Sequence, residues 1–294
     1  MASPDAAAGA RVPVPRSPSA MLLRIAVAAV LLVMLLSALV AGIVWLSILI
    51  GALVMVGTAE YYLITRRMGH AAAPWVLFPL TLVLLFRFHI DGVAPWALPA
   101  ALSLAVVVGL GRFLFLRQPG NSMVRWALAL AGALYLGWTL GFYFALYTAH
   151  DPDPGRIGFA WVVALAGSTM IGDTVALLVG SRLGRHRFFP SISPNKSVEG
   201  AVGGFIAATI AFATLSTLAD LPFVHGLILG ALVAVAAQAG DLIESQFKRS
   251  AGVKDASNLL PGHGGLLDRI DSLVLIPGVA YYYLILVVHL RLPQ

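Results

Sequence analysis

The chain has 294 residues, of which 60% are hydrophobic and 11% charged, and its formal net charge is +6. Soluble domains are roughly half apolar and about a quarter charged, so this composition excludes an ordinary soluble domain and indicates a membrane protein. The absence of cysteine excludes disulfides, thiolate catalysis and cysteine-ligated metal centres. The basic residues lack the interleaved aromatic residues of a nucleic-acid surface, so no nucleic-acid partner is expected.

Residues 1–20 are rich in Ala, Pro and Ser and predict a disordered cytoplasmic tail. Nine transmembrane helices are predicted after it, because a bilayer core about 30 Å thick needs about 20 apolar residues in a helix. Helices satisfy their own backbone in lipid, and the alternating pattern of a membrane barrel is missing. The predicted helices are 22–40, 42–64, 74–88, 94–115, 126–148, 158–180, 200–219, 223–245 and 272–290. The expected fold is therefore all-α and polytopic, with N-terminal transmembrane helices over 21–150 and a C-terminal catalytic region over 151–294.

Two hydrophilic loops, 181–199 and 246–271, are longer than a helix connection requires, and long loops in compact proteins usually carry function. Basic residues gather in these loops and in the loops after the second and fourth predicted helices. The positive-inside rule places all four loops in the cytoplasm. Two crossings then put the N-terminus there as well, with Gln294 outside. The prediction is a multi-pass protein of the cell (inner) membrane with its active site facing the cytoplasm.

Polar residues are costly inside a membrane, so their positions point to function. Asp173 lies in the sixth predicted helix. Asp241 and Glu244 lie three residues apart near the cytoplasmic end of the eighth helix, on one face of it. Asp268 and Asp271 repeat this spacing just before the ninth helix. Carboxylate oxygens at helix ends are ligands that suit Mg²⁺, which usually also binds substrate phosphates.

Cations and glycines surround these carboxylates. The cations that could hold phosphate groups are Lys248, Arg249, Lys254 and Arg269. The glycines of the turn at 261–265 allow a backbone to approach a ligand closely. Such a combination suits phosphoryl or nucleotidyl transfer, where catalysis is positioning and charge stabilisation. No Walker A, GxGxxG or nucleophile-elbow motif offers a competing chemistry. In the other loop, Ser197 or Asn195 is expected to cap the next helix, whose N-terminus would face an anion.

The stretch SQFKRSAGVKDASNLLPGHGGLLDRID, from Ser245 to Asp271, resembles the signature of phosphatidate cytidylyltransferases, also called CDP-diacylglycerol synthases. That signature reads S-x-hydrophobic-K-R, four residues, K-D-x-small, then P-x-H-G-G and D-R-x-D. The stretch from Asp173 to Gly200 is similar to a second block of the family, which ends in S-P-x-K-S/T-x-E-G. Asn195 stands where the family often has a second Lys, and Leu177 where an aromatic residue is common. The resemblance covers roughly residues 158–290, and the first 150 residues are similar only in being hydrophobic spans.

The resemblance implies transfer of the cytidylyl group of CTP to phosphatidic acid within the lipid bilayer, giving CDP-diacylglycerol and pyrophosphate for phospholipid biosynthesis. It implies Mg²⁺, with room for a second cation, held by Asp241 and Asp268, and it suggests a homodimer. The expected catalytic residues are Lys248, Arg249, Lys254, Asp255, His263 and Arg269. The expected substrate-binding residues are Asp173, Ser193, Lys196, Ser197, Glu199, Ser245, Gly264, Gly265 and Asp271.

Two other functions remain open at this stage. A CTP-dependent lipid-alcohol kinase would share the polytopic helices and the nucleotide chemistry, but it would not need the complete signature from Ser245 to Asp271. An ion-coupled secondary transporter would bind its ion at intramembrane carboxylates, yet such proteins favour broken helices in two related halves. Single residues have structural alternatives too: Asp268 would suit an N-cap of the last helix, and Glu244 an ion pair.

Overall fold

The computed structural model describes residues 18–90, 93–112, 121–148, 156–260 and 264–290. These residues form helices joined by loops, with two isolated β-bridges and no β-strand. The helices are α1 (Pro18–Ala41), α2 (Ile43–Arg67), α3 (Pro74–Leu85), α4 (Arg87–Ile90), α5 (Ala97–Gly111), α6 (Ser122–Ala133), α7 (Thr139–Tyr147), α8 (Arg156–Leu183), α9 (Val198–Leu215), α10 (Phe223–Ser250), α11 (Leu267–Ile270) and α12 (Ile276–Leu286). A π-helical segment η2 (Leu134–Trp138) joins α6 to α7, and the 3-10 turns η3 (Ser216–Ala219) and η4 (Asp271–Leu273) follow α9 and α11.

Six helical segments of the described residues are long and apolar enough to cross a membrane. They are Ile43–Arg67, Ser122–Tyr147, Arg156–Leu183, Val198–Ala219, Phe223–Ser250 and Leu267–Leu286. Large apolar side chains such as Val40, Val107 and Leu177 are exposed on the helices, as expected of a surface that faces lipid. The prediction of an all-α, multi-pass membrane protein is confirmed. All nine predicted ranges overlap helices, but α3, α5 and the apolar part of α1 are short, so the count of nine spans stays a prediction.

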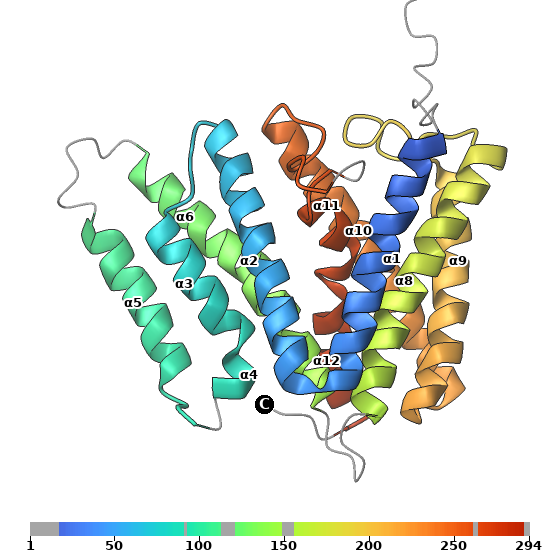
Figure 1. The fold of residues 1–294 in the computed structure, drawn as a ribbon, viewed down its shortest axis with the longest axis horizontal. Helices are drawn as coiled ribbons and strands as arrows, with labels where there is room; N and C mark the ends of the chain where they lie inside the picture. Colours follow the sequence, from blue (N-terminus) through green and yellow to red (C-terminus); the bar gives the residue numbers. More distant parts are fainter. Residues whose placement is uncertain (1–17, 91–92, 113–120, 149–155, 261–263, 291–294) are drawn as a thin grey trace, which may run out of the picture.

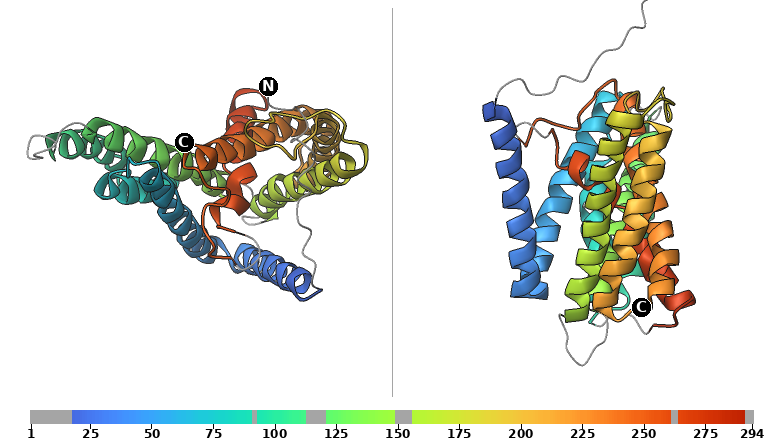
Figure 2. Two further views of the ribbon diagram at one scale, coloured as in Figure 1. Left: turned by 90° about the horizontal axis from the view of Figure 1, so that it is seen from above. Right: turned by 90° about the vertical axis from the view of Figure 1, so that its right-hand side faces the viewer.

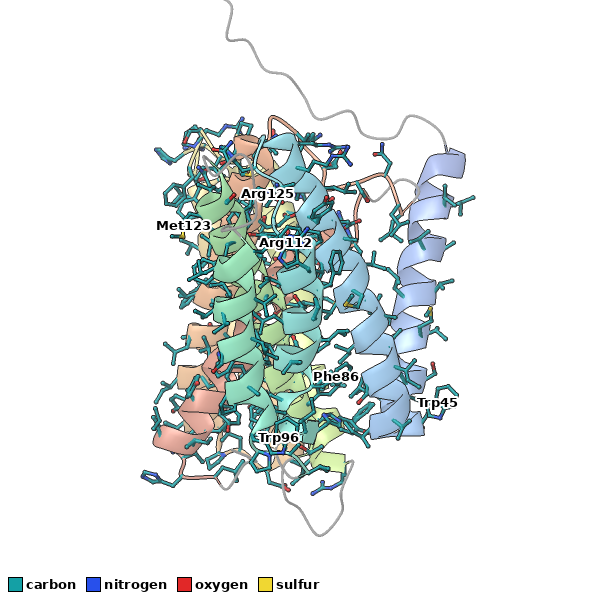
Figure 3. The ribbon with its side chains drawn as sticks, turned by 90° about the vertical axis from the view of Figure 1, so that its left-hand side faces the viewer. Trp45, Phe86, Trp96, Arg112, Met123 and Arg125 are labelled. Atoms are coloured by element: carbon teal, nitrogen blue, oxygen red, sulfur yellow. The ribbon has the colours of Figure 1, made fainter. Side chains whose placement is uncertain are left out.

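The helices run side by side, and the two polar loops lie at the same end of the molecule, where α1 also begins (Figure 1). The view from above shows α8, α9 and α10 on one side and α3, α5 and α6 on the other, with α2 between them (Figure 2). α2 contacts α1, α3 and also α11. Arg112 and Arg125 lie toward the loop end, whereas Trp45 and Trp96 lie near the opposite end (Figure 3). Charge and aromatic residues are therefore distributed as in a protein that crosses a bilayer.

Small residues allow α8 and α9 to pack closely. A Cβ atom on Gly204 would lie 2.8 Å from Ala176 Cβ and 2.8 Å from the Gly172 carbonyl oxygen, so the two backbones nearly touch. Such close approaches are typical of helix pairs in membranes, where small residues replace bulky ones at the interface. Asp173 directly follows Gly172, so this contact fixes where α8 presents its carboxylate relative to α9.

Both polar loops are shorter than predicted because the flanking helices continue into them. α10 ends at Ser250 rather than at residue 245, which places Lys248 and Arg249 in its last turn. Cations are favoured at a helix C-terminus, and the chain turns only at Gly252, whose φ is 68°. The last predicted helix, 272–290, is also wrong at its start, since helical structure begins at Leu267. α11, η4 and α12 form that segment in three pieces, with Pro277 in the first turn of α12, where a missing N–H is tolerated.

Candidate active site

The two polar loops meet at an ion pair between Lys196 and Asp241. Lys196 belongs to the loop between α8 and α9, and its Nζ donates to Oδ2 of Asp241 on α10. Ser245, one turn further along α10, places its Oγ 3.4 Å from the other carboxylate oxygen, Oδ1. Both charged side chains are 30% exposed, so the pair stands where a solute could reach it. The structure thus brings together three predicted site residues from two distant segments.

Two further carboxylates lie beside this ion pair. Asp173 on α8 and Asp271 on η4 both lie close enough to Asp241 for their like charges to interact. Ser272 Oγ lies 3.4 Å from Asp173 Oδ2, and the Ser272 N–H donates to Asp271 Oδ1 at 2.7 Å. Three helical segments far apart in the sequence therefore present acidic oxygens to one region. The like charges repel one another, which makes this region attractive to a cation.

A second cation of the site, Lys248, is buried between two carboxylates. Lys248 Nζ lies 2.5 Å from Asp268 Oδ1 and 2.6 Å from Glu244 Oε2. All three side chains are buried, and Glu244 is fully so. The contact with Glu244 is an ion pair whose alignment is poor for a hydrogen bond, and Glu244 Oε1 has no hydrogen-bond partner in the described part of the chain. The predicted phosphate-binding Lys248 is therefore neutralised by protein carboxylates in this structure.

Asp268 also binds the backbone of the loop before it. Its Oδ2 accepts hydrogen bonds from the N–H groups of Ala256, at 2.9 Å, and Gly265, at 2.7 Å. The next two N–H groups, of Leu266 and Leu267, donate to a carboxylate from a different helix, Glu60 on α2, at 3.0 and 2.6 Å. The first N–H groups of a helix have no partner within it, so these carboxylates satisfy the start of the last span.

Two predicted glycines of this loop sit where a side chain would not fit. Gly264 has φ of 81°, in the left-handed region that favours glycine. A Cβ atom on Gly265 would lie 2.8 Å from Glu60 Oε1 and 2.9 Å from Ala256 Cβ. The turn is therefore pressed against the Glu60 carboxylate, and the predicted substrate role of both glycines stays a prediction.

The start of α9 is built by residues of the other loop. Ser197, rather than Asn195, caps the helix, because its Oγ accepts from the Gly200 N–H at 3.1 Å. Glu199 accepts hydrogen bonds from the N–H groups of Arg185, at 3.1 Å, and His186. Ser197 and Glu199 therefore shape the loop that presents Lys196, and their predicted contact with substrate is not tested.

The remaining predicted residues are mostly exposed. Arg249 links the two loops, since its Nε donates to the Ile192 carbonyl at 3.2 Å and its Nη1 to the Val253 carbonyl at 3.1 Å. Lys254, Asp255 and Arg269 are exposed, as are Arg249 and Asp173. Ser193 is half-buried, and its carbonyl accepts from the Lys196 N–H. His263 lies outside the described residues.

Mg²⁺ fits the donor chemistry of Asp241 better than that of Asp268. Asp268 is buried and accepts hydrogen bonds from Lys248 and from two backbone N–H groups, whereas Asp241 is 30% exposed and its hydrogen-bond donors are the side chains of Lys196 and Ser245. Within the described ranges, no group of three or more His, Asp or Glu side chains is arranged to hold a metal ion. Mg²⁺ usually binds one or two carboxylates together with waters and substrate phosphates, so Asp241 with its acidic neighbours suits a site that a nucleotide completes.

Sequence reasoning missed the contribution of the N-terminal helices. Glu60 receives three hydrogen bonds from the signature loop, including one from Ser257 Oγ at 2.5 Å. A signal was available, because Glu60 is the only Asp or Glu between residues 6 and 90 and lies inside a predicted span. Tyr135 of η2 also lies near the site, where its ring packs edge-on against Phe247 of α10 at 5.6 Å. π-helical segments are rare and frequently occur near functional sites.

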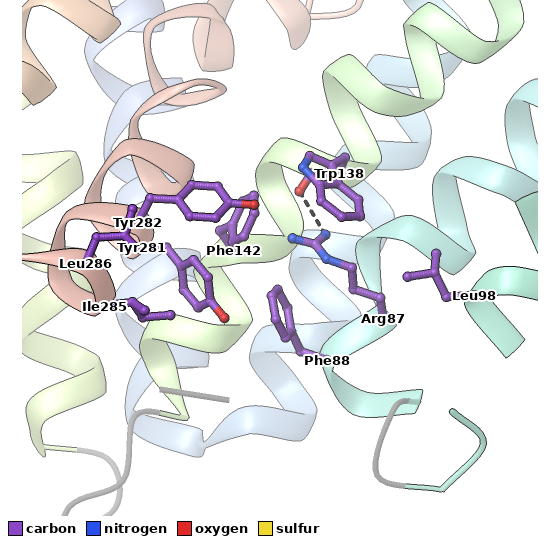
Figure 4. Close-up of a pocket in the computed structure, with 9 residues that line it drawn as sticks. All are labelled: Arg87, Phe88, Leu98, Trp138, Phe142, Tyr281, Tyr282, Ile285 and Leu286. Atoms are coloured by element: carbon purple, nitrogen blue, oxygen red, sulfur yellow. Dashed lines mark hydrogen bonds between the residues drawn. The ribbon is translucent and has the colours of Figure 1, made fainter. Parts of the chain in front are cut away.

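A pocket of about 330 Å³ lies away from this polar cluster, near α4 and α12 (Figure 4). Its centre is the buried Arg87, whose guanidinium lies 4.1 Å from the Trp138 ring centroid and 4.2 Å from that of Phe142. Arg87 Nη1 donates to the carbonyls of Trp138 and Leu84, both at 2.8 Å. Among the described residues, no Asp or Glu lines the pocket, so we place the chemistry at the polar cluster and not here.

Fold and site together define a multi-pass membrane protein whose carboxylates and cations converge at one end of the bundle. The model of the cytidylyltransferase family matches residues 22–287. The chain therefore belongs to the cytidylyltransferase family, and the resemblance seen in the sequence is confirmed.

Several relatives carry the name phosphatidate cytidylyltransferase. That of Bacillus subtilis (strain 168) is 42% identical over 116 residues, which are 39% of this chain and 43% of the relative. That of Staphylococcus aureus (strain COL) is 36% identical over 152 residues, 51% of this chain and 55% of the relative. That of Staphylococcus saprophyticus is 38% identical with the same coverage. The chain spans about half the length of the relatives it matches.

Replacing Lys248 by Met should destabilise the protein strongly, because it leaves Glu244 and Asp268 buried without their cation. Removing one partner of a buried ion pair costs about 3–5 kcal/mol. Lys196→Met is the matched control: its pair with Asp241 is 30% exposed, and exposed pairs contribute about 0–1 kcal/mol. Chemical unfolding in detergent measures both variants. Equal stability of the two would contradict the buried role of Lys248.

Proposed function

We propose that the protein transfers the cytidylyl group of CTP to phosphatidic acid, giving CDP-diacylglycerol and pyrophosphate. The observation that carries this proposal is the convergence of Lys196 with Asp241 and of Lys248 with Asp268 at one end of an apolar helix bundle. Lys196, Lys248 and Asp268 lie in the two segments that resemble the phosphatidate cytidylyltransferase pattern, and Asp241 lies four residues before Ser245. The names of the relatives support the same reaction.

The reaction joins two polyanions, which determines what the protein must supply. An oxygen of the lipid phosphate attacks the α-phosphorus of CTP, and the bond from that phosphorus to the oxygen bridging to the β-phosphate breaks. Pyrophosphate leaves with the electron pair. The attacking oxygen is already anionic, so no general base is required. The protein's task is to position both phosphates and offset their charge, for which Lys196, Lys254 and Arg269 are accessible.

We propose Mg²⁺ as the cofactor, with Asp241 as its protein ligand and Asp173 and Asp271 beside it. When bound, the ion would neutralise phosphate charge and polarise a phosphoryl oxygen. Asp268, predicted as the second ligand, binds Lys248 and two backbone N–H groups, so its contribution here is to hold the loop in place. A role for it at a second cation stays a prediction, as does a homodimer.

The position of the site at the loop end of the spans suits a substrate that lies in the bilayer. Phosphatidic acid lies in the bilayer with its phosphate at the surface, and the polar cluster lies at the loop end of the spans (Figure 1). The positive-inside rule assigns that end to the cytoplasm, where CTP is available. We therefore propose the cell (inner) membrane as the location, with the site on its cytoplasmic side.

Purified protein in detergent should release pyrophosphate only when CTP, phosphatidic acid and Mg²⁺ are all present. Asp241→Asn should lower turnover by about 10²-fold or more, in the range found when one charge-stabilising group is removed. Asp220→Asn is the control, because Asp220 is exposed and pairs with Arg156 away from the site. No pyrophosphate from folded wild-type protein, or an equal loss in both variants, would contradict the proposal.

The absence of cysteine allows a direct test of sidedness. A cysteine at Asn195, in the loop before α9, should react with a membrane-impermeant thiol reagent only from the cytoplasmic side. A cysteine at Val93, which is 87% exposed between α4 and α5, should react only from the opposite side. Inside-out and right-side-out vesicles separate the two cases, and the reverse pattern would overturn the proposed orientation.

A further inference from the structure

Glu60 lies in α2, outside both segments that carry the family pattern. We propose that Glu60 is a positioning residue for the transfer reaction: its carboxylate holds residues 264–267 in place and thereby fixes the loop that carries Asp268. The inference rests on the proposed function for its catalytic consequence, while the structural contact itself is independent of that function.

Both carboxylate oxygens of Glu60 accept hydrogen bonds from the segment 257–267. Glu60 Oε1 accepts from Ser257 Oγ at 2.5 Å and from the Leu266 N–H at 3.0 Å, and Oε2 accepts from the Leu267 N–H at 2.6 Å. These partners are 197 to 207 residues away in the sequence. Glu60 is only 3% exposed. Its contacts therefore tie the second helix of the chain to the start of the last span.

Placing a carboxylate at this contact costs free energy. Ionisable groups within membrane spans are costly, and those that occur mark functional sites by default. None of the ion pairs among the described residues includes Glu60, so its charge is stabilised by N–H and O–H donors alone. A serine or asparagine can cap a helix without that cost. A negative charge and two acceptor oxygens are more than a helix cap needs, so we infer a further role for Glu60.

The contacts of Glu60 continue into the site. Three consecutive N–H groups, at 265, 266 and 267, all donate to carboxylates: the first to Asp268 and the other two to Glu60. Asp268 in turn holds Lys248, which faces Glu244. A shift of this turn would move Asp268 and Lys248 together. A misplacement of about 1 Å at a reacting centre can lower a rate by about 10²-fold.

Glu60→Gln is the sharpest test, because it keeps the size of the side chain but turns one acceptor oxygen into a donor. In either orientation the new NH2 group opposes a backbone N–H, that of Leu266 or that of Leu267. We expect kcat to fall by about 10²-fold with little change in KM for CTP, since Glu60 touches the loop rather than the substrate. Glu60→Asp, which keeps both acceptor oxygens on a shorter side chain, should recover part of the loss. Thr58→Val is the matched control: Thr58 is equally buried on α2, and its hydroxyl bonds only to Val54 of the same helix among the described residues.

Hydrogen exchange provides a readout that does not depend on activity. In Glu60→Gln, the amides of Leu266 and Leu267 should exchange faster while the rest of the protein keeps its protection. Unchanged exchange at these amides would overturn the inference, and so would turnover equal to wild type or a loss of protection spread over the whole chain. If the wild-type protein shows no turnover, the proposed reaction fails, and the exchange at these two amides still decides whether Glu60 holds the loop.

Discussion

The ion pair between Lys248 and Asp268 supports the rest of the site. Both side chains are buried, as is Glu244 on the other side of the ammonium group, so each charge depends on the others for its stability. Asp268 passes this constraint on to the loop, because its second oxygen binds two backbone N–H groups. Glu60 anchors the same turn from α2. The layer below the polar surface is thus a closed arrangement of carboxylates, one cation and backbone N–H groups, with few acceptors left open.

The accessible layer above it has a different character. Lys196 and Asp241 are partly exposed, and Asp173 and Asp271 add negative charge beside them. A buried layer held together by the ion pairs of Lys248 and the hydrogen bonds of Asp268 gives the accessible groups a rigid base. The accessible groups retain the freedom to exchange protein partners for phosphates. This division suits a reaction between two polyanions, in which rigid positioning and charge stabilisation supply most of the rate. It also explains why the two loops, so far apart in the sequence, must meet at one end of the bundle.

The sequence predicted the helices and the polar end well, because hydrophobic runs and charged loops are local properties. The resemblance also implied that Lys196 and Asp241 serve one site, but it did not predict the ion pair between them. Local patterns did not predict the helix boundaries correctly. α10 continues through Lys248 and Arg249, five residues beyond its predicted end at residue 245. Local reasoning also failed at η2, which no local pattern distinguishes from a regular helix. Glu60 was missed because its partners lie about two hundred residues away, although a lone carboxylate within a span was a visible warning.

In the proposed reaction, the cytidylyl group of CTP, with its α-phosphate, is transferred to a lipid phosphate. The most direct measurement uses CTP labelled in either the α- or the γ-phosphate, with purified protein, Mg²⁺ and phosphatidic acid, followed by extraction of the lipid. The account predicts label in the lipid only from the α-position, with the γ-label recovered in pyrophosphate. Label in the lipid from the γ-position would show a kinase instead and would contradict the account.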